Sequence, residues 1–141
     1  MDTNIKFMVV LQKLQLSFLK KLGQNINDLG MTNSEFLILA HLNENDKEKT
    51  QKLGEIAAIT SGTITYTVNK LLKQGYVTKL PDENDHRITW VSLTETGRAH
   101  YQTLFQQHKI YLDQLLNQFS DQEKLAFIEQ VKYFGKNIDS R

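Results

Sequence analysis

The sequence predicts a mainly α-helical protein that carries one β-hairpin between its helices. Apolar residues recur every three or four positions along most of the 141 residues, which is typical of amphipathic helices. The period changes to two at 76–80 and 88–93, which indicates two short strands. A chain of this length can bury a core without disulfides or a metal, and we expect a single domain over residues 1–141.

The first expected helix covers residues 5–22 and is apolar on more than one side. One apolar stripe recurs at steps of three and four residues and consists of Phe7, Leu11, Leu14, Phe18 and Leu22. A second set widens this apolar surface and consists of Ile5, Val9, Leu16 and Leu19. Such a helix needs more than one partner. Packing within the monomer and pairing of two subunits are equally good explanations. Turn-favouring residues at 25–30 are expected to end the helix.

The next expected helix begins at a capping box. Thr32 supplies the hydroxyl and Glu35 the carboxylate of this motif. The residues from Phe36 to Leu42 are apolar nearly all round, so this helix should be central and buried. The polar run 43–49 is interpreted as a solvated loop.

Two short helices follow, joined by a tight connection at 58–60. Thr60 is expected to cap the second helix, at about 61–74, and Gly75 to end it. The apolar side of this helix spans about 100° of arc and is formed by Ile64, Val68, Leu71 and Leu72. The opposite arc contains no acid and is formed by Gly62, Thr63, Tyr66, Asn69, Lys70 and Lys73.

The hairpin and two further helices complete the chain. The polar run 81–87 joins the two strands, and Asp85 could brace the guanidinium of Arg87 in a bidentate pair. Three acids lie at this tip, Asp82, Glu83 and Asp85, and they would repel any polyanion unless at least one of them has an internal partner. Thr94 is expected to cap a long helix that reaches about residue 119, and a second capping box at 120–123 begins a helix that ends near 138.

Helix, tight turn, helix and hairpin, in that order, form a winged helix-turn-helix. The outer arc of the second helix then faces a polyanion, where hydroxyl and amide groups can contact base edges and lysines can contact phosphates. An arginine at the hairpin tip can enter the minor groove. The net charge is only +1, but residues 61–80 hold three lysines and no acid. An ordinary solvated helix face and a polar turn without a partner remain the alternative interpretations.

The order and spacing of several short motifs resemble the MarR family, most strongly over residues 32–98. These motifs are Leu53-Gly54-Glu55-Ile56-Ala57, Thr63-Ile64-Thr65, Asn69-Lys70-Leu71, Gln74-Gly75-Tyr76-Val77, Asp82-Glu83-Asn84-Asp85-His86-Arg87 and Val91-Ser92-Leu93-Thr94-Glu95-Thr96-Gly97. The resemblance implies a homodimer paired through helices at 5–22 and 98–138. It also implies a palindromic operator in double-stranded DNA, and repression relieved by a small aromatic or amphipathic effector.

The same resemblance implies roles for individual residues. It places Thr63, Thr65, Tyr66 and Asn69 on the recognition helix and makes Asp85 and Arg87 the wing pair. Two departures from the family pattern concern DNA contacts: Tyr66 stands where many members have arginine, and Glu83 and His86 replace the usual proline and first arginine of the wing.

Other functions receive little support from the sequence. The absence of cysteine excludes disulfides and thiol redox sensing, and the four histidines have no metal-site spacing, so we expect no metal and no cofactor. The sequence contains neither a nucleophile elbow nor a phosphate-binding glycine loop, so it does not indicate an enzyme. Neither a signal peptide nor a membrane span is recognisable, so we expect a cytoplasmic protein. The alternative to a DNA-binding regulator is a winged-helix module that binds other proteins.

Overall fold

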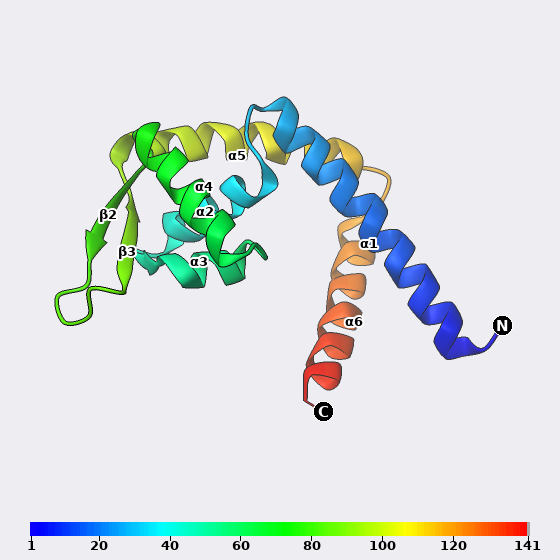
Figure 1. Cartoon of the computed structure of the whole chain (residues 1–141). Coiled ribbons are helices and arrows are strands. Elements are labelled where there is room, and N and C mark those ends of the chain that lie inside the picture. Colours follow the sequence, from blue (N-terminus) through cyan, green and yellow to red (C-terminus); the bar gives the residue numbers. More distant parts are fainter. Residues whose placement is uncertain (141) are drawn as a thin grey trace. The chain divides into compact units, whose positions relative to one another are not determined.

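The computed structural model describes residues 1–140 and contains six α-helices and a three-stranded sheet in that range. The order along the chain is α1 (Thr3–Asp28), α2 (Asn33–Glu44), β1 (Glu48–Lys49), α3 (Thr50–Ile56), α4 (Ser61–Lys73), β2 (Val77–Pro81), β3 (Thr89–Leu93), α5 (Glu95–Leu115) and α6 (Asp121–Asp139) (Figure 1). The chain divides into two units, Met1–His108 and the part from Lys109 onward. None of the helices in residues 1–140 is long and apolar enough to cross a membrane.

The core of the first unit lies among α2, α3, α4 and the sheet. Its fully buried side chains come from every one of these elements, and they include Ile38, Leu39, Leu42, Leu53, Ile64, Leu71, Val77 and Val91. The predicted winged helix-turn-helix is therefore confirmed as one packed lobe in which α3, α4 and the hairpin share a core.

Helix α1 continues to Asp28, so the prediction that residues 25–30 end it was wrong for the first four of these positions. Tertiary contacts hold this last turn. Ile26 is only 2 % exposed within the core, and the Oδ1 atom of Asn25 lies 2.7 Å from Nδ1 of His108 on α5. Because these contacts favour the helical backbone, they override the turn preference of asparagine. The turn comes at Gly30, whose φ of 85° suits glycine.

The predicted capping box of α2 is present. The Glu35 backbone N–H donates to Oγ1 of Thr32 over 3.2 Å, and the Thr32 N–H donates to Oε2 of Glu35 over 3.4 Å. The apolar side chains Ile38, Leu39 and Leu42 are fully buried, as expected for a central helix.

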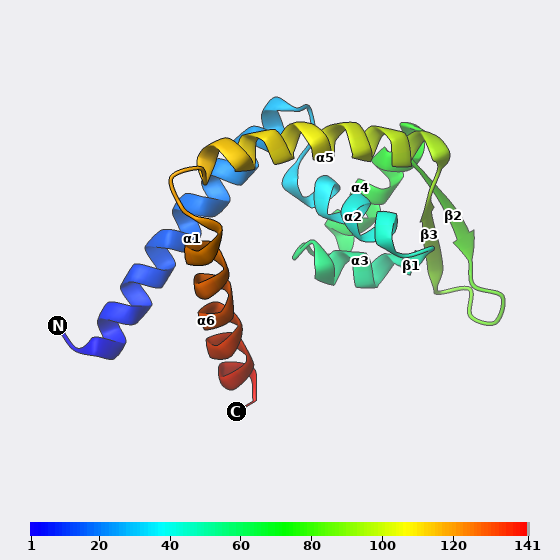
Figure 2. The same ribbon diagram turned by 180° about the vertical axis from the view of Figure 1, so that it is seen from behind.

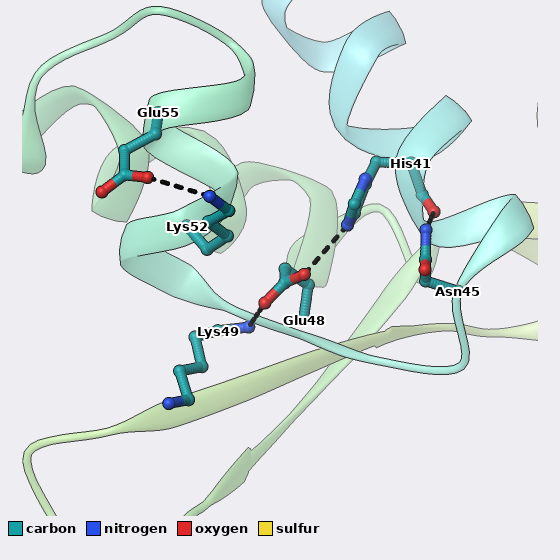
Figure 3. A network of polar contacts seen from close by, with 6 residues as sticks. All are labelled: His41, Asn45, Glu48, Lys49, Lys52 and Glu55. Carbon is teal, nitrogen blue, oxygen red and sulfur yellow. Dashed lines mark hydrogen bonds and ion pairs between the residues drawn. The ribbon is translucent and has the colours of Figure 1, made fainter.

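Residues 48–49 form strand β1, which the sequence analysis wrongly assigned to a loop. Glu48 pairs with Val91 and Lys49 with Trp90, so that β3 is the middle strand of the order β1-β3-β2, and Figure 2 shows β1 beside β3. A strand of two residues is too short to show a period. Its hydrogen bonds come from a distant segment, so the local sequence does not indicate it. The His41 ring on α2 also holds this segment, with its Nε2 atom 3.0 Å from Oε2 of Glu48 (Figure 3).

Helix α4 has the predicted caps. Thr60 accepts the Thr63 N–H over 3.3 Å, and Gly75 adopts a φ of 78° just beyond the helix. The predicted apolar side was wrong at Leu72, which is 40 % exposed, whereas Thr67 is buried in its place. The hydroxyl of Thr67 donates to the Thr63 carbonyl over 2.8 Å, so the polar group of this side chain is satisfied within its own helix.

Helix α5 begins as predicted, because Oγ1 of Thr94 accepts the Gly97 N–H over 2.9 Å. It ends at Leu115, four residues before the predicted end, and turn residues separate it from α6. Ser120 caps α6 by accepting the Glu123 N–H over 3.1 Å.

Candidate nucleic-acid interface

The outer side of α4 is open to solvent, as the apolar arc requires. Every residue predicted there is exposed, namely Gly62, Thr63, Tyr66, Asn69, Lys70 and Lys73. Thr65, which the family resemblance places on the same helix, is exposed as well. Tyr66 has 70 % of its surface exposed. A Cβ atom built on Gly62 would meet no atom within 4 Å, so the start of the helix is also accessible. This side can meet a broad surface without rearrangement.

Lys70 differs from the other residues of this side because its charge has an internal partner. Its Nζ atom lies 2.6 Å from Oε1 of Glu35, a carboxylate on α2 that is buried although the lysine is not. The hydrogen bond and the charge of Glu35 raise the pKa of Lys70. Lys70 thus neutralises a buried acid, whereas Lys73 is exposed one turn further on.

A second cross-link joins α4 to the hairpin. The Lys79 ammonium on β2 donates to Oδ1 of Asn69 over 3.0 Å. Lys79 is one of the three lysines of residues 61–80, but it was not predicted to be a site residue. Lys79 lies on β2, ten residues after Asn69. The spacing does not indicate this contact, because the contact depends on the turn that reverses the chain between α4 and β2.

Arg87 and Asp85 form the bidentate pair that the sequence analysis predicted. The Nε and Nη2 atoms of Arg87 donate to the two carboxylate oxygens of Asp85, each over 3.0 Å, and the Arg87 N–H donates to Oδ1 over 3.0 Å. These hydrogen bonds hold the pKa of Asp85 below its ordinary value. The Arg87 side chain is nevertheless 91 % exposed, so the pair fixes its direction without covering it.

Asp82 also has internal partners, so two of the three acids at the tip are engaged. Its carboxylate accepts the Trp90 indole N–H over 2.9 Å and the backbone N–H groups of Asn84 and Asp85 over 3.1 and 3.0 Å. The indole hydrogen bond, followed by the two backbone bonds, lowers the pKa of Asp82. The Lys47 and Lys49 ammonium groups lie 4.5 and 5.4 Å from the centre of the Trp90 ring. The tip is therefore an ordered turn.

A hollow of about 260 Å³ lies between α4, the hairpin and the segment that leads into α3. Three cationic side chains line it, Lys49, Lys79 and Arg87, together with hydroxyls that include that of Thr65. None of the described residues that line it is acidic. The lining of the hollow is therefore positively charged.

Three of the four histidines, His41, His100 and His108, take part in packing or in polar pairs. His100 stacks on Tyr76 with ring centres 4.3 Å apart, and buried His108 lies edge-on to Phe36. Burial lowers the pKa of His108, which favours the neutral ring. Within residues 1–140 no group of three or more metal-ligating side chains comes together.

Comparisons with known proteins agree with this architecture. The family model of the transcriptional regulator SarA/Rot matches residues 19–104. The HTH-type transcriptional regulator SarZ of Staphylococcus aureus is 30 % identical over 125 residues, which cover 86 % of this chain and 82 % of SarZ. A MarR-like transcription regulator from Bacillus cereus superposes with a TM-score of 0.80 at 20 % identity, over 95 % of this chain and 96 % of that one.

A ligand-bound structure is also similar. The crystal structure of NadR in complex with 4-hydroxyphenylacetate has a TM-score of 0.70 at 21 % identity and covers 91 % of both chains. Because the SarA/Rot model spans more than half of the residues and the winged helix-turn-helix is complete, the chain belongs to the SarA/Rot family of MarR-like transcriptional regulators.

Proposed function

We propose that this regulator binds a palindromic double-stranded DNA operator as a homodimer, and that it represses transcription until a small effector binds. The observation that carries the proposal is the outer side of α4, which is exposed and free of acids, next to an exposed Arg87 aimed by Asp85. Residues Gly62, Thr63, Thr65, Tyr66, Asn69 and Lys73 would lie against the major groove, and Arg87 in the adjacent minor groove. No catalytic activity is proposed.

Dimer formation is supported by exposed apolar residues at both ends of the chain. Helix α1 exposes Ile5, Leu11, Leu14, Leu16 and Leu19, and α6 exposes Leu125, Ile128, Val131 and Ile138. Single subunits of soluble proteins rarely expose this much apolar surface in continuous rows. We propose that 5–22 and 98–138 pair two copies, which would set two recognition helices about one DNA turn, roughly 34–36 Å, apart.

The proposed effector is a small aromatic or amphipathic molecule. NadR, which shares the fold, was crystallised with an aromatic acid. The hollow beside Thr65 could take the carboxylate of such a molecule, because three cations line it. A ligand there would occupy the side of α4 that DNA needs, and binding would then be mutually exclusive.

Selection of bound duplexes from a random DNA pool tests the proposed function. The expected product is an inverted repeat, and the affinity for it should fall steeply with salt as counterions are released. The expected mass in solution, measured by light scattering, is that of a dimer. Binding without sequence preference, or without salt dependence, would favour the protein-binding module instead.

Replacing Arg87 with alanine is expected to weaken operator binding about tenfold or more, because a charge-assisted hydrogen bond contributes ~1.5–3 kcal/mol. Titration of the labelled operator measures the change. Arg98→Ala is the matched control, since the Arg98 guanidinium is engaged by the Asn43 carbonyl over 3.1 Å. Equal affinities of Arg87→Ala and the unmodified protein would show that the wing does not contact DNA.

Replacing Asn69 with alanine is expected to cost about 1–3 kcal/mol of operator binding and to relax the preference at one base pair in each half-site. The measurement compares the selected operator with variants at each position. If the substitution weakened binding to the operator and to random DNA equally, Asn69 would have no role in base recognition.

A further inference from the structure

The hydrogen bond between Lys79 and Asn69 determines which part of the Asn69 amide is available to DNA. A lysine ammonium has only donors, so the group that faces it must be the amide oxygen. This oxygen, Oδ1, lies 3.0 Å from the Lys79 Nζ atom. The two hydrogens on Nδ2 are on the other arm of the amide, away from the lysine. Asn69 therefore offers donors on its free side.

The backbone around the pair keeps these side chains in reach of each other. Helix α4 passes into β2 through a turn in which the Tyr76 N–H donates to the Leu71 carbonyl over 3.0 Å and Gly75 has a φ of 78°. The Tyr76 carbonyl in turn accepts the Thr94 N–H over 3.1 Å. Lys79 then sits within the hydrogen-bonded ladder, opposite Val91 of the middle strand. The helix and the strand are fixed relative to each other before any ligand binds.

No carboxylate competes with Asn69 for Lys79 among the described residues that line the hollow. Lys79 lines the hollow with Lys49 and Arg87, and the described lining residues include no acid. The nearby positive charges repel the ammonium, which donates instead to the Asn69 oxygen. Lys79 and Asn69 together present ammonium and amide hydrogens, and Lys79 already occupies one of the two lone pairs of the Asn69 oxygen. Donors therefore predominate in this patch.

A patch in which donors predominate distinguishes the two purines. Guanine presents two acceptors in the major groove, O6 and N7, whereas adenine presents the N7 acceptor beside the N6 donor. Asparagine ordinarily recognises adenine by accepting from N6 with the oxygen that Lys79 engages here. Resting on the proposed operator binding, we infer that Lys79 is a specificity-determining residue, which makes Asn69 select guanine over adenine.

The test is selection from a random duplex pool with the full-length protein and four variants. Asn69→Ala identifies the base pair that depends on Asn69. Lys79→Met removes the donor and keeps the aliphatic chain, and Lys79→Arg keeps a donor. Lys73→Met is the matched control, because Lys73 is an exposed lysine on the same side of α4 as Asn69.

The expected result is a preference for guanine at the identified pair that falls about tenfold in Lys79→Met. Lys79→Arg retains the preference, and Lys73→Met weakens binding to all duplexes alike. Two results would overturn the inference if operator binding is intact. One is an unchanged guanine-to-adenine ratio in Lys79→Met, and the other is a preference of the unmodified protein for adenine. Absence of any selected sequence for the unmodified protein would instead overturn the proposed function itself.

Discussion

The Gly97→Ala variant should lose about 3 kcal/mol or more of its free energy of unfolding, because the added methyl group has no space. A Cβ atom at this position would overlap the Tyr76 carbonyl oxygen, and it would lie 2.8 Å from the carbonyl carbon and 3.0 Å from Cδ2 of Leu93. The carbonyl cannot withdraw easily, since it accepts the Thr94 N–H over 3.1 Å. Relief would require α5 to separate from the start of the hairpin.

Urea denaturation at a fixed protein concentration measures this loss, since subunit association contributes to apparent stability. Gly23→Ala is the control, because a Cβ atom at Gly23 in α1 would meet no atom within 4 Å. That variant should gain up to about 1 kcal/mol from the helix propensity of alanine. Equal stabilities of Gly97→Ala and the unmodified protein would mean that the contact between α5 and the hairpin is not tight in solution.

The elements with their own local signals could be predicted from the sequence. Caps at Thr32, Thr60, Thr94 and Ser120 located four helix starts, because each hydroxyl acts on an N–H group only three residues away. Failures occurred where distant contacts decide the local structure. Strand β1 depends on pairing with β3, and the last turn of α1 depends on Ile26 and on Asn25 beside His108.

The candidate site shows the same division. Helical periodicity identified its exposed residues, and a spacing of two residues identified the pair of Asp85 and Arg87. The contacts of Lys70 with Glu35 and of Asn69 with Lys79 span 35 and 10 residues, and they depend on how α4 packs against α2 and β2. Composition and periodicity identify which residues are exposed, but not which exposed charges are already engaged.

Replacing Lys70 with methionine is expected to cost about 2 kcal/mol of stability, because it leaves the buried carboxylate of Glu35 without a cation. Glu35 is 4 % exposed, whereas the Lys70 side chain is 43 % exposed and can turn to water. Glu35→Gln should therefore cost less, about 1 kcal/mol, since glutamine can still accept the Thr32 N–H of the capping box. Urea denaturation of both variants and of the double variant measures the coupling between the two side chains.

DNA binding separates this internal role of Lys70 from a phosphate contact. If the ammonium remains with Glu35, operator affinity should keep the same salt dependence in Lys70→Met, measured where the variant is fully folded. In Lys73→Met, whose lysine is exposed, stability should change by less than about 0.5 kcal/mol. Its salt dependence should weaken by about one unit of slope if Lys73 contacts a phosphate. A similar loss of slope in Lys70→Met would show that DNA draws the ammonium away from Glu35, and the buried carboxylate would then oppose binding.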